Sequence, residues 1–174
     1  MSSNHGPGQN ILIHGGAGGI DSVAIQAAKS IGAYVATTAR VDDRAYVQEL
    51  GADEVIDYQQ EAFEDKLKNF DAVLDTIAGD RTEKSFKVLM EGGTLVSMVG
   101  PPPPEMAQKA RIMAIGQSTH VTTEVLNRLA QLVEGGAVKI RVSKVTALEK
   151  AKEAFQLVEE GHPHGKVVFE VKQG

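Results

Sequence analysis

Cysteine is absent from this 174-residue sequence, and so is tryptophan. Without cysteine the chain can form no disulfide bond, no thiolate nucleophile and no thiolate-bound structural zinc site. No stretch approaches the roughly 20 apolar residues that are needed to span a bilayer, and residues 1–9 are polar and contain no apolar signal core. We therefore expect a soluble protein of the reducing cytoplasm, with no membrane partner.

Basic runs are also absent, and the formal net charge is -5. This balance disfavours nucleic acid and anionic membrane surfaces as partners, so an anionic ligand would need a local site. Hydrophobic residues make up 42% of the chain and charged residues 24%, which is ordinary for a globular protein of one domain. Residues 1–9 are rich in Ser, Asn, Gly and Pro, and we expect them to form a flexible lead.

Short apolar runs rich in β-branched residues alternate with helical patterns from residue 10 almost to the end, which is typical of βαβ units. The pattern predicts an α/β fold of Rossmann type, with a doubly wound parallel sheet of about six strands over residues 10–138. The expected strands are 10–14, 34–39, 54–58, 71–76, 94–99 and 111–115, and the expected helices are 19–31, 44–50, 62–68, 81–90 and 123–134. Pro101 to Pro104 are expected to stop strand pairing and form an extended turn.

The pattern changes at about residue 139, after which we expect a C-terminal helix-strand extension over residues 139–174. A strand-like segment over 139–145 precedes a helix over 149–160, and a final strand covers 167–171. Histidines 162 and 164 stand beside acidic residues, but a Gly-His-Pro-His-Gly run is typical of a turn. We predict no metal site.

Glycines cluster between the first expected strand and the first expected helix, where residues 15–21 read Gly-Gly-Ala-Gly-Gly-Ile-Asp. A dinucleotide fingerprint has meaning only in this strand-to-helix position. Backbone amides at the helix start must approach a pyrophosphate, so residues there must lack side chains that would hold the phosphates away. Gly16 and Gly18 satisfy this requirement.

Position 21 departs from the fingerprint, because Asp21 stands where a third glycine allows close helix packing. For a carboxylate about 5 Å from a phosphate charge, at an effective dielectric constant near 20, Coulomb's law gives roughly 3 kcal/mol of repulsion. Without a ligand, the helix dipole favours an aspartate in the first turn. We hypothesise that Asp21 stabilises the empty domain and weakens dinucleotide binding.

The residue at the end of the second strand usually selects the cofactor, because an acidic residue there accepts the ribose 2′-hydroxyl of NAD and a basic one meets the 2′-phosphate of NADP. Here that residue is Arg40, with Arg44 one helical turn further on. Asp42 and Asp43 oppose this basic signal. The position nevertheless predicts NADP(H).

Five blocks of sequence, in this order, resemble the zinc-free medium-chain dehydrogenase/reductases of the quinone oxidoreductase type. The blocks are HGGAGGIDSVAIQAAK (14–29), LGADEVIDY (50–58), VLDT (73–76), EGGTLVSMVG (91–100) and GKVVFEV (165–171). The resemblance implies the NADP(H)-binding domain of an oxidoreductase that reduces quinones or α,β-unsaturated carbonyls by hydride transfer. It also implies the cofactor-binding residues, which are Gly16, Ala17, Gly18, Gly19 and Ile20 at the pyrophosphate, Arg40 and Tyr58 at the 2′-phosphate, Thr76 at the adenine-side crevice and Gly100 at the nicotinamide end.

In such enzymes a catalytic domain precedes the cofactor domain, and the counterpart of residues 139–174 completes it. We therefore expect the isolated chain to be inactive and assign a catalytic role to no residue. The apolar residues of the extension should fold against the Rossmann body or another copy, which predicts a dimer or higher assembly. These residues are Val145, Leu148, Phe155, Val167 and Phe169.

Other nucleotide-binding classes fit less well. No tyrosine is followed four residues later by lysine, as a short-chain dehydrogenase requires, and the glycine turn contains no Gly-Lys-Ser/Thr for a P-loop. Ile13 and His14 stand where a methyltransferase usually has an acidic residue. Two classes stay open, which are a cofactor-binding part of an oxidoreductase and a non-catalytic folded module that has lost dinucleotide binding through Asp21.

Overall fold

A computed structural model describes residues 8–159 and 164–171 of the chain. Six strands form one sheet in the order β3-β2-β1-β4-β5-β6, and every neighbouring pair is parallel. The strands are β1 (Asn10–Ile13), β2 (Tyr34–Ala39), β3 (Glu54–Asp57), β4 (Phe70–Asp75), β5 (Leu89–Ser97) and β6 (Met113–Gly116). This is the strand order of a Rossmann fold, which confirms the predicted fold class and strand number.

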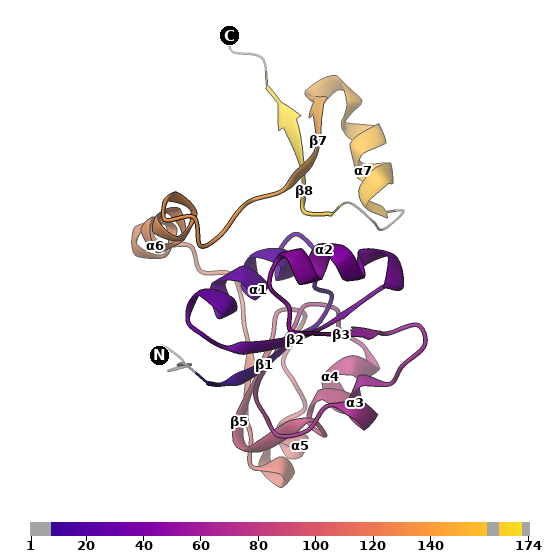
Figure 1. Ribbon diagram of the computed structural model, residues 1–174, viewed down its shortest axis with the longest axis vertical. Helices are drawn as coiled ribbons and strands as arrows, with labels where there is room; N and C mark the ends of the chain where they lie inside the picture. Colours follow the sequence, from indigo (N-terminus) through magenta and orange to yellow (C-terminus); the bar gives the residue numbers. More distant parts are fainter. Residues whose placement is uncertain (1–7, 160–163, 172–174) are drawn as a thin grey trace.

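Helices cover both faces of the sheet (Figure 1). One face carries α1 (Asp21–Ser30) and α2 (Arg44–Glu49), and a 3-10 turn, η1 (Val41–Asp43), leads into α2. The other face carries α3 (Phe63–Lys66), α4 (Asp80–Ser85) and α5 (Pro104–Ala110). The result is the three-layer architecture that alternating strand and helix patterns predict.

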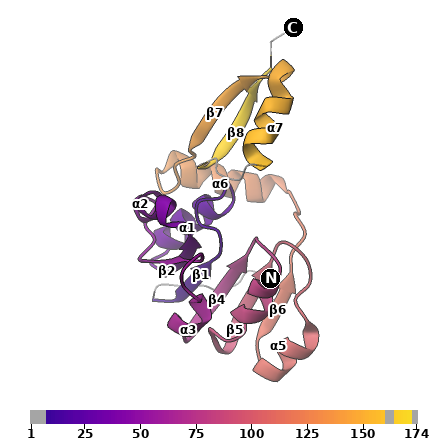
Figure 2. The same cartoon turned by 90° about the vertical axis from the view of Figure 1, so that its right-hand side faces the viewer.

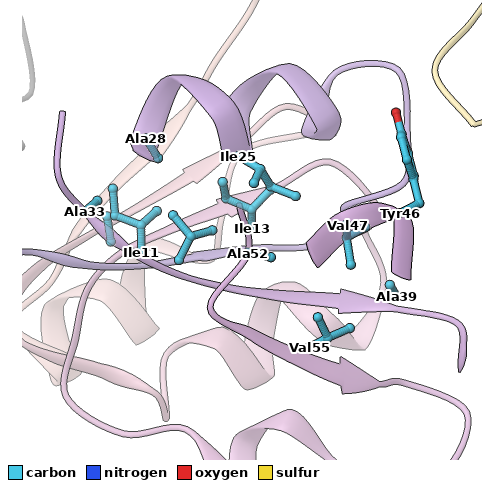
Figure 3. Close-up of a cluster of buried hydrophobic side chains, with 12 residues drawn as sticks. Ile11, Ile13, Ile25, Ala28, Ala33, Ala39, Tyr46, Val47, Ala52 and Val55 are labelled. Atoms are coloured by element: carbon cyan, nitrogen blue, oxygen red, sulfur yellow. The ribbon is translucent and has the colours of Figure 1, made fainter. Parts of the chain in front are cut away.

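Alternate side chains of each central strand enter different cores, because successive residues of a strand point to opposite faces. Ile11 and Ile13 pack with Ile25 of α1 in the cluster that Figure 3 shows. Leu12, between them, packs with Phe63 of α3 in the second cluster. Both faces of the parallel sheet are thus buried, which explains the nearly continuous apolar run of β1.

Tertiary packing overrides the sequence pattern at two places in the body. The predicted helix over 81–90 is wrong beyond Ser85, because Phe86 and Val88 turn into the second core cluster and β5 begins at Leu89. The predicted extended turn over Pro101 to Pro104 is wrong at its end, where Pro104 begins α5. Proline suits this first helical position, since its missing N–H would have no helical partner there.

The C-terminal extension forms a separate small unit beyond α1 and α2 (Figures 1 and 2). It consists of β7 (Val142–Ala147), the 3-10 turn η2 (Leu148–Lys150), α7 (Ala151–Glu159) and β8 (Lys166–Glu170), and β7 pairs in parallel with β8. We predicted the first of these strands over 139–145, but both backbone groups of Lys139 instead bond to the Gln26 side chain of α1. Those bonds anchor the start of the extension on the body.

Several apolar side chains of the extension are exposed, so the described structure does not bury them against the Rossmann body, and their burial against another copy stays a prediction. Val145 is 60% exposed and Phe155 is 64% exposed, and Leu148 and Phe169 are exposed as well.

The predicted helix over 123–134 forms as α6 (Thr123–Glu134), and it buries none of its residues. Among the described residues, no helix is long and apolar enough to cross a bilayer.

Candidate functional site

The glycine turn follows β1 at the carboxyl edge of the sheet, beside the end of β4. The strand order reverses between β1 and β4, and ligands of open α/β sheets bind in the crevice that this reversal creates. The turn is held on β2 as well, because Gly15 N donates to Thr38 Oγ1 at 3.1 Å and Gly16 N donates to Thr38 O at 3.1 Å. The sequence motif therefore lies where a phosphate-binding turn must lie.

His14, directly below this turn, serves as a neutral structural bridge. Its ring is fully buried, with Nδ1 3.2 Å from Thr38 Oγ1 and Nε2 3.0 Å from Ser85 Oγ. Burial lowers the pKa of His14 to about 4, so the ring is uncharged at neutral pH. A ring enclosed in this way positions the turn, and the described structure gives it no access to a substrate.

Two glycines of the turn leave no room for a side chain. A Cβ at Gly16 would lie 2.3 Å from Thr37 Oγ1 and 2.9 Å from the Ile25 Cδ1, so this glycine lets α1 approach β2. A Cβ at Gly18 would lie 2.6 Å from Asp21 Oδ2 and 3.1 Å from Gly15 O. The requirement for glycine at these two positions is therefore steric.

A cavity of about 710 Å³ opens above the turn, within the usual size range of small-molecule sites. Five of the predicted cofactor-binding residues line it, and these are Ala17, Gly18, Gly19, Arg40 and Tyr58. The other predicted residues, Gly16, Ile20, Thr76 and Gly100, do not line it. Gly16 lies buried beneath the turn, and Gly100 lies exposed in the loop after β5.

The sequence analysis missed two parts of the cavity wall. Arg81 of α4 lies over the Tyr58 ring, with its guanidinium carbon 5.3 Å from the ring centroid, and so adds a second guanidinium to the one at Arg40. The segment 164–167 of the extension forms another wall. The Gly-Lys pair at 165–166 begins the GKVVFEV block of the family resemblance, but nothing in its local pattern indicates that it lies over residues 17–19.

Both aspartates that opposed the basic signal of Arg40 have partners in the structure. Asp42 Oδ2 lies 3.4 Å from Arg40 Nη2 in an exposed pair. Asp43 is buried and bonds to His164 Nε2, and the His164 ring stacks on Tyr46 at 4.9 Å between centroids. Asp43 therefore ties the extension to the body as well as lining the cavity.

Asp21 is buried at the start of α1, below the glycine turn. Thr76 Oγ1 donates to its Oδ1 at 2.8 Å, and the other oxygen points toward Gly18. Burial raises the pKa of Asp21 to about 6, and the hydrogen bond from Thr76 and the charge of Lys166 oppose that rise. Thr76 thus acts on the site by positioning this carboxyl group.

The direction of this shift bears on the expectation that Asp21 stabilises the empty domain, which stays a prediction. A raised pKa means that the folded state disfavours the charged form of this carboxyl group. The predicted effect on ligand binding is a separate question and stays a prediction.

No group of three or more His, Asp or Glu side chains that could hold a metal ion occurs among residues 8–159 and 164–171. His162 lies outside the described residues, so the structure places only His164 and Gly165 of the Gly-His-Pro-His-Gly run. The absence of a metal site stays a prediction.

Comparison with known proteins matches residues 50–169 to the zinc-binding dehydrogenase family. The chain is similar to the 2-methylene-furan-3-one reductase of Solanum lycopersicum, with 36% identity over 93% of this chain and 40% of the relative. It is also similar to the chloroplastic NADPH-dependent alkenal/one oxidoreductase of Arabidopsis thaliana, with 35% identity over 92% of this chain and 40% of the relative.

Among solved structures, the quinone oxidoreductase from Coxiella burnetii aligns with a TM-score of 0.90 at 36% identity. The alignment covers 96% of this chain and 54% of that one. The chain thus spans about half of the length of the proteins that it matches.

The burial of Asp21 predicts a pH-dependent stability that an Asp21→Asn variant lacks. Between the usual pKa of 3.8 and the folded-state value of about 6, the folded protein retains a proton that the unfolded chain has released, so stability falls as the pH rises. The loss is complete near pH 7 and is on the order of 3 kcal/mol. The asparagine side chain of the variant has no charge, so urea denaturation at pH 7 should show the variant to be more stable.

Near pH 4 the carboxyl group is protonated, and we expect wild type and variant to differ little in their free energy of unfolding. A variant that is less stable than wild type at pH 7 would show that the helix-dipole interaction outweighs desolvation after all.

Proposed function

Because the chain belongs to the zinc-binding dehydrogenase family, as a quinone oxidoreductase-like member of the medium-chain dehydrogenase/reductases, we propose that its cavity binds NADP(H). One observation supports this most directly. The same cavity combines a glycine turn at the start of a helix with two guanidinium groups, those of Arg40 and Arg81. A dinucleotide that carries a diphosphate and a 2′-phosphate needs both features.

The shape of the turn fits this cofactor. Gly18 and Gly19 both line the cavity, and neither carries a side chain that would project from the turn. We propose that the backbone at Ala17, Gly18 and Gly19 binds the diphosphate, while Gly16 and Ile20 set the direction of the first turn of α1. A phosphate at this place would meet backbone amides and the positive end of the helix dipole.

The phosphate of the adenosine ribose is assigned to the opposite part of the cavity. Arg40 follows β2 and Tyr58 follows β3, so both lie on the β3 side of the glycine turn. Arg81 is held over the Tyr58 ring by a cation–π contact. We propose that these three side chains bind the 2′-phosphate and adenosine, and that Gly100 lies toward the nicotinamide end.

Bound NADPH would supply the hydride for reduction of a quinone or an α,β-unsaturated carbonyl compound. We propose this substrate class because one similar protein is named as an alkenal/one oxidoreductase and another as a quinone oxidoreductase. The chain's own contribution is to bind and orient the cofactor. We propose that this chain does not catalyse the reduction by itself, since it corresponds to about half of each relative. We also propose that the reaction needs no zinc.

A non-catalytic module that has lost dinucleotide binding is the second candidate, and the buried Asp21 carboxyl beside Gly18 is the observation that favours it. The thermal stability of the chain in NADPH separates the two candidates. At 100 times its dissociation constant, a ligand that binds only the folded state stabilises it by about 2.7 kcal/mol.

We predict such a stabilisation by NADPH, measured as a rise in melting temperature. An unchanged melting temperature at millimolar NADPH would support the second candidate. In that case an Asp21→Gly variant should regain binding if repulsion by this carboxyl group is the reason.

Arg40 should determine the preference for the phosphorylated cofactor. We predict that Arg40→Ala weakens NADPH binding by about 10-fold or more, because a hydrogen bond to a charged group contributes about 1.5 to 3 kcal/mol. NADH has no 2′-phosphate, so its affinity should change little. Fluorescence titrations of both cofactors measure this difference.

Arg44→Ala is the matched control, since Arg44 is a neighbouring guanidinium that does not line the cavity. Equal losses of NADPH affinity in the two variants would show that general positive charge, and not a contact at Arg40, is responsible.

We propose that the protein is cytoplasmic. We also propose that a second copy covers the exposed apolar residues of the extension. Val145, Leu148 and Phe155 are each exposed, and exposed apolar side chains of this size favour burial against a partner surface. Light scattering should give the mass of a dimer or a higher assembly. A monomer at micromolar concentration would count against this assignment.

A further inference from the structure

The segment 164–167 of the extension crosses directly over the glycine turn, although about 145 positions separate the two segments in the sequence. Gly165 N donates to Ala17 O at 3.5 Å. A Cβ at Gly19 would lie 3.1 Å from Lys166 Nζ and 3.2 Å from Gly165 O. The Lys166 ammonium group therefore lies against the part of the turn that we assign to the diphosphate.

The backbone that carries Lys166 has a defined path. Lys166 N donates to Arg141 O at 2.9 Å, where β8 begins to pair with the other strand of its sheet. Gly165 has a φ of +86°, and a Cβ there would lie 2.3 Å from Arg141 O. Only glycine fits this bend without strain, so the Gly-Lys pair is required for the ammonium group to reach the turn.

Side chains fix the same segment on the body. His164 bonds to Asp43 and stacks on Tyr46, and the Arg141 guanidinium carbon lies 4.7 Å from the centroid of the same Tyr46 ring. Two residues of the extension thus contact the same ring of α2, and these contacts anchor the segment. Lys166, two residues from His164, is placed over the cavity by this anchoring.

The positive charge of Lys166 can offset the repulsion between the Asp21 carboxylate and an anionic ligand. Asp21 places a carboxyl group beside Gly18, and a carboxylate there opposes an anionic ligand. The positive charge of Lys166 lies near enough to oppose the rise of the Asp21 pKa. Among the described residues that line the cavity, Arg40, Arg81 and Tyr58 lie toward β3 or α4, and Lys166 is the cation at the glycine turn.

We propose that Lys166 binds the diphosphate of the dinucleotide, so that the C-terminal unit supplies a cation which offsets Asp21 and completes the glycine-turn site. The inference rests on the proposed function. It assigns a part in cofactor binding to residues 164–167, a segment that lies far from the glycine turn in the sequence. It also divides the phosphates between two groups, Lys166 at the diphosphate and Arg40 at the 2′-phosphate.

The test compares NADPH with adenosine 2′-monophosphate, which has the 2′-phosphate and no diphosphate. Lys166→Met should raise the dissociation constant of NADPH by roughly 10- to 100-fold, the loss expected for a charge-assisted hydrogen bond. It should leave that of adenosine 2′-monophosphate unchanged. Lys166→Arg keeps the charge and should retain most of the NADPH affinity. Calorimetry measures both ligands with each variant.

Lys144→Met is the matched control, because Lys144 belongs to the same two-stranded sheet, is exposed and does not line the cavity. We expect it to bind both ligands like wild type. Unchanged NADPH affinity in Lys166→Met overturns the inference and leaves the proposed function intact. An equal loss of both ligands also overturns it, because the substitution would then have disturbed the whole site.

A measurement without ligand tests the same geometry. Removal of the Lys166 charge should raise the pKa of Asp21 further, which carboxyl NMR of the folded protein can follow. An unchanged Asp21 titration would refute the electrostatic interaction between the two groups. If wild type binds neither ligand while the Asp21 titration does respond to Lys166→Met, the proposed function has failed and the cofactor role of Lys166 fails with it.

Discussion

The close approach of the turn after β1 to the strand β2 is the constraint on which the site depends. Gly16 has no side chain because Thr37 and Ile25 occupy the space where its Cβ would be. This contact sets the distance between α1 and the sheet, and so directs the first turn of α1 toward the crevice beside β4. His14 and Thr38 hold the turn from below through side-chain hydrogen bonds. The cavity is therefore a consequence of backbone packing before any ligand is considered.

Charge placement around this turn follows from the same close packing. Asp21 cannot reach solvent, so its carboxyl group is desolvated and depends on Thr76 and Lys166 for compensation. In our proposal, cofactor binding and stability are thus coupled through one buried group. A glycine at this position would avoid the coupling, whereas the aspartate makes both properties depend on pH and on the neighbouring cation.

The C-terminal unit has two kinds of surface, and they imply different roles. Its inner edge at His164 and Lys166 contacts the Rossmann body and lines the cavity. Its apolar residues on other surfaces, such as Val145 and Phe155, are exposed in the described structure. The inner contacts explain how so small a unit is held in place with few buried residues of its own. The exposed residues are those for which we propose cover by a second copy.

The sequence by itself determined the order of the strands, the helices other than α5, the glycine turn and the family, because these depend on local periodicity and on short motifs. The family resemblance predicted nine cofactor-binding residues, and the structure places five of them, Ala17, Gly18, Gly19, Arg40 and Tyr58, at the cavity. Only the tertiary structure decided that Phe86 leaves a helix to enter the core, that Asp21 is buried, and that residues 164–167 lie over residues 17–19. Such contacts join segments far apart in the chain, and no local pattern encodes which distant residue will remove water from a carboxylate or place an ammonium group beside it.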